Sequence, residues 1–98
     1  MVESGDYLEW IYNFYIFYNI MTNLEKYNAA FCETLNVKVE QLADLKYQGV
    51  PEWDSVGHMS LVAAIEDAFD IMMEMDDIID LSSYEKGKEL LKKYGVEL

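Results

Sequence analysis

The sequence predicts an all-α protein, a small bundle of three main helices with one short helix placed before the last of them. Three observations support this fold class. Apolar residues recur three and four positions apart in three separate stretches, helix-capping residues precede those stretches, and no stretch alternates between polar and apolar residues as a strand would. The length of 98 residues allows one domain at most.

The first twenty residues are rich in aromatic side chains and differ from the rest of the chain. Tyr7 and Tyr18 belong to a helically spaced stripe, but other apolar residues fall off that stripe, so the segment is apolar nearly all round. Directly after it, Thr22 and Glu25 have the spacing of a capping box, which marks a fresh helix start. We therefore predict that residues 1–20 are an appendage, either an extra helix or disordered, and that the domain spans 21–98. An interaction segment is the functional alternative for the appendage.

The first helix of the domain is predicted to run from Thr22 to about Asn36. Its apolar stripe consists of Leu24, Tyr27, Phe31 and Leu35. A long connection, residues 37–53, follows, and Gly49 and Pro51 prevent regular structure at its end. Within the connection we expect three apolar residues to anchor a short turn on the core: Val39, Leu42 and Leu45.

The second helix is predicted to begin with Asp54 or Ser55 as its N-cap and to end near Phe69, with Asp70 starting the exit. At about 100° per residue, one side of this helix forms a core stripe of His58, Leu61, Val62, Ile65 and Phe69. The opposite side carries a strip of apolar residues, Val56, Met59 and Ala63, within an acidic rim of Glu66, Asp67 and Asp70. Isolated apolar residues are common on surfaces, but a strip that leads to Ser55 favours a docking face.

The C-terminal part is predicted to hold a helix of one or two turns within residues 73–80 and then the last main helix. Ser82 and Glu85 offer a capping box for that last helix. Its apolar positions are Tyr84, Leu90, Leu91 and Tyr94. Lys92 and Lys93 suit the negative end of the helix dipole, and Gly95 suits the C′ position.

The charge of the chain limits its partners. Seven basic residues, all Lys, face nineteen acids, which gives a net charge of −12. Eight of the acids lie within residues 54–80, which contain no Lys or Arg. Nucleic acid is therefore excluded as a partner, because phosphate binding needs a basic surface, and basic protein surfaces are the natural complement.

Cysteine content and hydropathy indicate a cytoplasmic protein. The single cysteine, Cys32, cannot form an internal disulfide and falls in an apolar helical pattern, so we expect a small buried side chain. The aromatic run of the appendage is too short to span a membrane, which takes about 20 apolar residues, and no secretory signal is visible. We expect a monomer without a membrane span.

The residues alone predict only a helix cap at Ser55. A helix start would also suit an attached phosphate, because its amides and dipole favour anions. A catalytic triad is disfavoured, since His58 is the single histidine and falls on the core stripe. We expect His58 to be a packed or capping side chain, with contact to a phosphate as the alternative. The acids Asp76, Asp77 and Asp80 lack calcium-loop spacing, so no metal site is predicted.

The motif Asp54-Ser55-Val56, within the stretch from Pro51 to Val62, resembles the attachment motif of acyl carrier proteins. In that family the serine after the aspartate carries 4′-phosphopantetheine, and the next residue is most often leucine. Val56 departs mildly from this pattern and keeps an apolar side chain there. The resemblance covers roughly residues 22–98 and implies a bundle with a long first loop and a short third helix between helices two and four.

The resemblance implies a free-standing acyl carrier domain that performs no catalysis itself. A phosphopantetheinyl transferase would move 4′-phosphopantetheine from coenzyme A to the Ser55 hydroxyl, with Asp54 as the motif neighbour. The thiol of the arm would then hold an acyl or aminoacyl group as a thioester for fatty acid, polyketide or related biosynthesis. A loading ligase and downstream transferases or synthases would bring basic surfaces of their own. These would contact six residues of this chain: Val56, Met59, Ala63, Glu66, Asp67 and Asp70.

A function of another class is the alternative to the carrier hypothesis. The chain is then an unmodified acidic helical adaptor that keeps the carrier fold as a protein-interaction module. The two hypotheses differ in whether Ser55 gains a phosphopantetheine unit.

Overall fold

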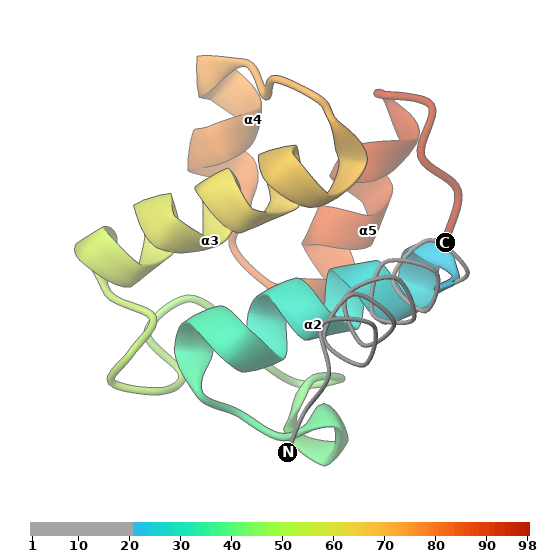
Figure 1. Cartoon of the computed structure of the whole chain (residues 1–98). Helices are drawn as coiled ribbons and strands as arrows, with labels where there is room; N and C mark the ends of the chain where they lie inside the picture. Colours follow the sequence, from blue (N-terminus) through green and yellow to red (C-terminus); the bar gives the residue numbers. More distant parts are fainter. Residues whose placement is uncertain (1–20) are drawn as a thin grey trace, which may run out of the picture.

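The computed structural model describes residues 21–98, and the predicted appendage lies outside these described residues (Figure 1). The described chain folds into helices α2, α3, α4 and α5 and the 3-10 helix η1. Their bounds are α2 (Asn23–Leu35), η1 (Val39–Gln41), α3 (Ser55–Phe69), α4 (Met75–Asp80) and α5 (Tyr84–Lys92). Residues 21–98 contain no strand beyond an isolated bridge between Lys46 and Ser83. The predicted all-α class is confirmed.

Helix α2 begins with the predicted capping box. The Thr22 hydroxyl accepts from the Glu25 amide at 3.1 Å, and the Thr22 amide donates to the Glu25 carboxylate at 2.8 Å. The helix ends at Asn36, which adopts the left-handed conformation with φ of 55°. Three of the four predicted stripe residues are fully buried, namely Tyr27, Phe31 and Leu35. Leu24, in the first turn, is 38% exposed, so the stripe starts one turn later than predicted.

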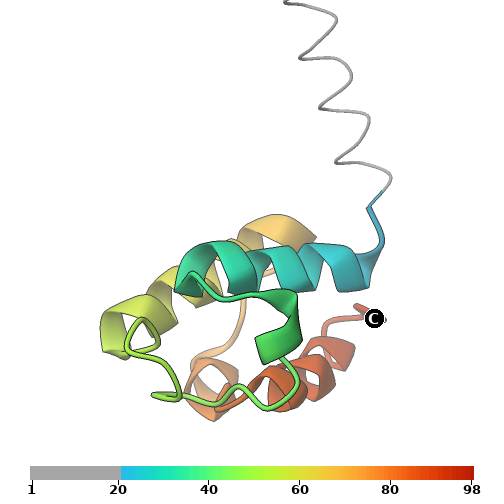
Figure 2. The same cartoon turned by 90° about the horizontal axis from the view of Figure 1, so that it is seen from below.

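The long loop between α2 and α3 is fixed by buried side chains and by backbone hydrogen bonds. Leu42 and Leu45 are buried as predicted, whereas Val39, at the start of η1, is exposed, so its predicted anchoring role is wrong. The loop also pairs with the α4–α5 linker, because the amide of Tyr47 donates to the carbonyl of Ser82 at 2.9 Å. Figure 2 shows the loop running past α5 and α4 before it reaches the start of α3.

A cluster of buried aromatic rings joins α2, the long loop and α5. The Phe31 ring centre lies 5.5 Å from that of Trp53 and 5.3 Å from that of Tyr84. The Tyr27 hydroxyl donates to the Tyr84 carbonyl at 2.6 Å, and a Cβ at Gly87 would overlap this hydroxyl. Gly87 therefore allows α5 to approach α2 closely. Helix α3 packs directly on α2 and covers another side of the same core.

The N-cap of helix α5 lies one residue later in the chain than the capping box predicted. Its N-cap is Ser83, whose hydroxyl accepts from the Lys86 amide at 3.0 Å, so the predicted box from Ser82 to Glu85 is wrong. The predicted role of Gly95 is confirmed at the other end. Gly95 has a φ of 79°, and the next amide, that of Val96, donates to the carbonyl of Leu91 at 3.1 Å. This pattern is that of a Schellman C-terminus.

Candidate functional site

Ser55 is the first residue of α3 and is exposed. The N-cap is its neighbour Asp54, whose carboxylate accepts from the amide of Gly57 at 2.8 Å. Of the two caps that the sequence allowed, the structure therefore selects Asp54. Within residues 21–98 the Ser55 hydroxyl makes no hydrogen bond. The hydroxyl is thus free for chemistry at the surface.

Trp53 and His58 fix the start of α3 from the inside. Trp53 is fully buried, and its indole N–H donates to Nδ1 of His58 at 3.0 Å. Because Nδ1 accepts, the ring proton is on Nε2, which donates to the carbonyl of Ile78 in α4 at 2.7 Å. The two rings are stacked, with 14° between their planes and 6.2 Å between their centres. His58 is thus the packed side chain that we predicted, and neither ring nitrogen is free to take a proton from Ser55.

Gly57 lets the loop before α3 lie directly against the first turn of the helix. A Cβ at this position would overlap the carbonyl oxygen of Glu52. The sequence reasoning missed this role, although a signal was present. A glycine inside a helix costs roughly 1 kcal/mol relative to alanine, so its use there indicates a close approach.

The two sides of α3 divide as the helical spacing predicts. Leu61, Val62 and Ile65 are buried, while His58 and Phe69, at the ends of the predicted core stripe, are half-buried. The core stripe is therefore fully buried only in the middle of the helix.

The opposite side of α3 is exposed, as a docking face requires. Val56 is 74% exposed and Met59 is 54% exposed, and Ala63, Asp67 and Asp70 are also at the surface. Glu66 differs from the other predicted docking residues. Its side chain is half-buried, and its carboxylate accepts from the Met73 amide at 2.8 Å, which ties the α3–α4 linker to α3. The contact of these six residues with a partner stays a prediction.

Helix α4 and the linker before it add exposed apolar residues that the sequence reasoning missed. Met72 is 84% exposed, Met75 is 69% exposed and Ile79 is 71% exposed. We call these three residues the α4 strip. The signal in the sequence was the spacing of four between Met75 and Ile79, which places both on one side of a helix.

The buried side of α4 is held by a polar contact with the C-terminal end of α5. Asp77 is buried, and its carboxylate accepts from the Lys93 ammonium at 2.7 Å and from the Tyr94 hydroxyl at 2.5 Å. Hydrogen bonds from Lys93 and then Tyr94 hold the pKa of Asp77 below its usual value. The same contact raises the pKa of Lys93. This clamp orients α4 so that the α4 strip faces outward.

Residues 54–80, which form α3, α4 and their linker, are strongly negative. Of the eight acids within residues 54–80, Glu66 and Asp77 are engaged as described above. The remaining six are exposed: Asp54, Asp67, Asp70, Glu74, Asp76 and Asp80. An approaching basic surface is therefore attracted to the part of the molecule formed by α3, α4 and their linker.

Cys32 lies in α2 and is not one of the candidate site residues. Its side chain is half-buried, and burial, followed by the charges of Glu33 and Glu40, raises the pKa of the thiol. A raised pKa lowers the thiolate fraction at neutral pH, which fits the predicted structural role.

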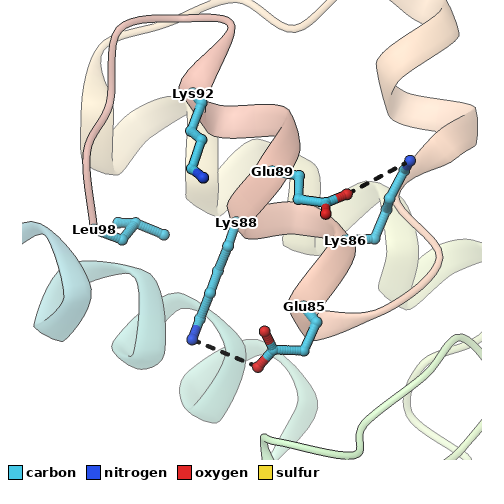
Figure 3. A pocket seen from close by; sticks show the side chains of 6 residues that line it. All are labelled: Glu85, Lys86, Lys88, Glu89, Lys92 and Leu98. Carbon is cyan, nitrogen blue, oxygen red and sulfur yellow. Dashed lines mark ion pairs between the residues drawn. The ribbon is translucent and has the colours of Figure 1, made fainter.

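A surface hollow of about 520 Å³ lies along α5 and contains no residue near Ser55 (Figure 3). Its charged lining is largely paired, by Lys88 with Glu85 at 3.5 Å and by Lys86 with Glu89 at 3.9 Å. Such exposed pairs are typical of a solvated helix face. The candidate site is therefore the surface around Ser55.

The chain matches no protein-family model, and neither a curated protein nor a solved structure matches it significantly. Within residues 21–98 no helix has both the length and the apolar content that crossing a membrane requires.

Proposed function

We propose that this protein is an acyl carrier protein whose Ser55 carries 4′-phosphopantetheine. The observation on which the proposal rests is the position of Ser55. It lies within the Asp54-Ser55-Val56 motif, begins α3, and exposes a hydroxyl that has no hydrogen-bond partner in the described chain. An attachment site needs such a hydroxyl, because the transferase must bring the pyrophosphate bond of coenzyme A to it.

The helix start supports the proposal physically. The amides of Ser55 and Val56 are the first two of α3 and have no acceptor within residues 21–98. The positive end of the helix dipole adds to them and favours a phosphodiester at this position. The Asp54 carboxylate accepts from the amide of Gly57. It therefore caps the helix without accepting from the amides of Ser55 and Val56.

The surface beside Ser55 supports a carrier that meets several enzymes. Val56 and Met59 give an apolar contact, and Asp67 and Asp70 lie exposed on the same helix. Opposite charge on a loading ligase, a transferase or a synthase speeds encounter, while a small contact keeps the complex short-lived. In this proposal the chain holds the acyl or aminoacyl group as a thioester on the arm and does not catalyse its transfer.

Intact-mass measurement after incubation with coenzyme A and a phosphopantetheinyl transferase tests the proposal. We expect the wild type to gain one phosphopantetheine unit and Ser55→Ala to gain none. Ser55→Ala should keep the fold, because Asp54 supplies the cap. Ser60→Ala is the matched control, since Ser60 is exposed on the same helix and should leave the modification unchanged.

The unmodified adaptor is the competing function. It gains support if several transferases leave the wild-type mass unchanged while the same folded protein forms a stable complex with a partner. That result would exclude the carrier function.

A further inference from the structure

The start of α3 is closed on the side that faces α4 (Figure 1). His58 follows Ser55 by three positions, so the two side chains are neighbours on the helix. Nε2 of His58 donates to the carbonyl of Ile78 in α4 at 2.7 Å, and Nδ1 accepts from the indole of Trp53 at 3.0 Å. Both hydrogen bonds must break before a group attached to Ser55 can pass between α3 and α4 at this point.

The side of the first turn that faces the long loop is closed as well. A Cβ at Gly57 would overlap the carbonyl oxygen of Glu52, so the loop backbone and the helix backbone are in direct contact. The loop is held in this position by its own hydrogen bonds. The amide of Gln48 donates to the carbonyl of Trp53 at 3.0 Å, and the amide of Trp53 donates to the carbonyl of Val50 at 3.1 Å.

Beneath the first turn the core is filled by rings. Trp53 is fully buried and stacks on His58, while Tyr47 packs edge-on against both rings, with 6.2 Å and 5.5 Å between the centres. Phe31 packs edge-on against Trp53 from α2. Within residues 21–98 every buried side-chain nitrogen or oxygen has a hydrogen-bond partner. An acyl chain that entered here would have to displace these rings, because protein interiors are close-packed.

The outer surfaces do not enclose a long chain either. Val56 and Met59 are exposed on α3, but a helix surface is convex and contacts one side of a chain only. The residues of the α4 strip are exposed by 69% or more, so a chain lying on them stays open to water. The hollow along α5 has a charged lining apart from Leu98. An alkyl chain on any of these surfaces remains largely in water, which is unfavourable.

We infer that the cargo on the Ser55 arm stays outside the folded chain, and that His58 closes the entrance between α3 and α4. The substrate class that suits such a carrier is a short or polar acyl group, aminoacyl groups included. These groups tolerate water, whereas a long alkyl chain does not. This inference rests on the proposed carrier function and narrows its cargo.

The test compares thermal unfolding of the full chain with an acetyl arm and with an octanoyl arm. A phosphopantetheinyl transferase installs each arm on Ser55 from the matching acyl-coenzyme A, and intact mass confirms loading. A chain that is in water in both the folded and the unfolded state leaves the free energy of unfolding unchanged. We therefore expect the two midpoints to agree within about 2 °C.

Burial of the octanoyl chain would give a different result. Burying a single methylene raises the midpoint of a domain of this size by about 3 °C or more. An octanoyl midpoint higher than the acetyl midpoint by more than about 2 °C would therefore overturn the inference. This comparison uses the wild type and does not depend on the folding of any variant.

His58→Ala tests the residue that closes the entrance. It leaves a gap beside Ser55, so the octanoyl arm should now raise the midpoint above that of the acetyl form of the same variant. His58→Gln, whose amide can also accept and donate, should behave as the wild type. Equal midpoints for the two arms in folded His58→Ala would overturn the role of His58.

The matched control is Leu91→Ala, which creates a cavity at a buried position of α5. Both views place the end of α5 away from the start of α3. Its two midpoints should agree, because a chain attached to Ser55 does not reach that cavity. Circular dichroism before heating confirms that each variant is folded.

Failure of this inference is distinguishable from failure of the carrier function. A wild-type chain that gains mass and is stabilised by the octanoyl arm removes the inference alone. A wild-type chain that gains no mass from either acyl-coenzyme A removes the carrier function and the inference together.

Discussion

Three consecutive residues have different structural roles at the start of α3. Trp53 is fully buried, Asp54 caps the helix, and Ser55 is exposed. The buried indole fixes the direction in which the chain enters the helix, and the cap fixes the first turn. The exposure of the Ser55 hydroxyl therefore follows from its neighbours and needs no interaction of its own.

Gly57→Ala should destabilise the fold even though alanine is the better helix former. The new Cβ overlaps a backbone oxygen of Glu52, which cannot rotate away as a side chain would. Overpacking costs up to about 3 kcal/mol and helix propensity returns about 1 kcal/mol, so we expect a net loss of about 2 kcal/mol. Urea unfolding followed by circular dichroism measures this change.

Ser60→Ala is the control for this substitution, because it places alanine at an exposed position of α3 where nothing has to move. It should change the free energy of unfolding by less than about 0.5 kcal/mol. A Gly57→Ala variant as stable as the wild type would show that residues 50–53 do not need to lie against the helix.

For α3, the sequence predicted which side chains are buried or exposed more completely than it predicted which residues they contact. The exposure of Val56 and the burial of Leu61 follow from helical spacing alone. The contact of His58 with Ile78 does not, because it joins residues twenty positions apart through a loop whose path the spacing cannot give. The close approach of Glu52 to Gly57 was also missed, although a glycine inside a helix is a signal of such an approach.

Helix α4 has six residues and is too short to be stable alone, so its position depends on the rest of the fold. The His58 hydrogen bond holds its C-terminal half, and the Asp77 clamp holds its inner face. Tyr94 adds a third contact, since its hydroxyl accepts from the amide of Glu74 at 2.8 Å. The sequence predicted a helix of one or two turns here but could not show which acid turns inward.

Stability should fall at low pH through the Asp77 clamp. The pKa of Asp77 in the folded state lies below its unfolded value of about 3.9, so ionised Asp77 favours folding above that pH. This contribution disappears as the pH falls below about 4 and through the folded pKa. Asp77→Asn should lower the thermal midpoint at neutral pH by several degrees, because the amide cannot accept from Lys93 and Tyr94 as the carboxylate does.

Thermal unfolding of the wild type and Asp77→Asn between about pH 2 and pH 8 checks this expectation, and the two midpoints should converge at the acidic end. Glu89→Gln is the control, since its pair with Lys86 is exposed and 3.9 Å long and should contribute little. Parallel curves for the wild type and Asp77→Asn would contradict the role of the clamp.

On the scale of the whole molecule, charge is distributed unevenly over the fold. Residues 54–80, which form α3, α4 and their linker, contain eight acids and no Lys or Arg. Residues 81–98, which include α5, contain four Lys and three acids. The sequence already showed this division, because charge counts need no tertiary structure. The structure adds that six of the eight acids are exposed and that Lys93 reaches back to neutralise Asp77.

This charge distribution predicts that salt acts in opposite directions on stability and on docking. Raising NaCl from about 0.01 M to 1 M shortens the Debye length from about 30 Å to 3 Å. Repulsion within a chain of net charge −12 then weakens, so the thermal midpoint should rise. Attraction to a basic transferase weakens too, so kcat/KM for the modification of Ser55 should fall.

The variant Asp67→Asn/Asp70→Asn tests whether docking depends on the charge of α3 or only on the net charge of the chain. Asp70 has a φ of 52°, a conformation that asparagine also adopts, so the variant should fold normally. We expect its kcat/KM to depend less steeply on NaCl than that of the wild type. Glu89→Gln/Glu97→Gln removes the same charge from α5 and the C-terminus and should keep the wild-type slope, whereas equal slopes in the two variants would show that net charge alone governs the encounter.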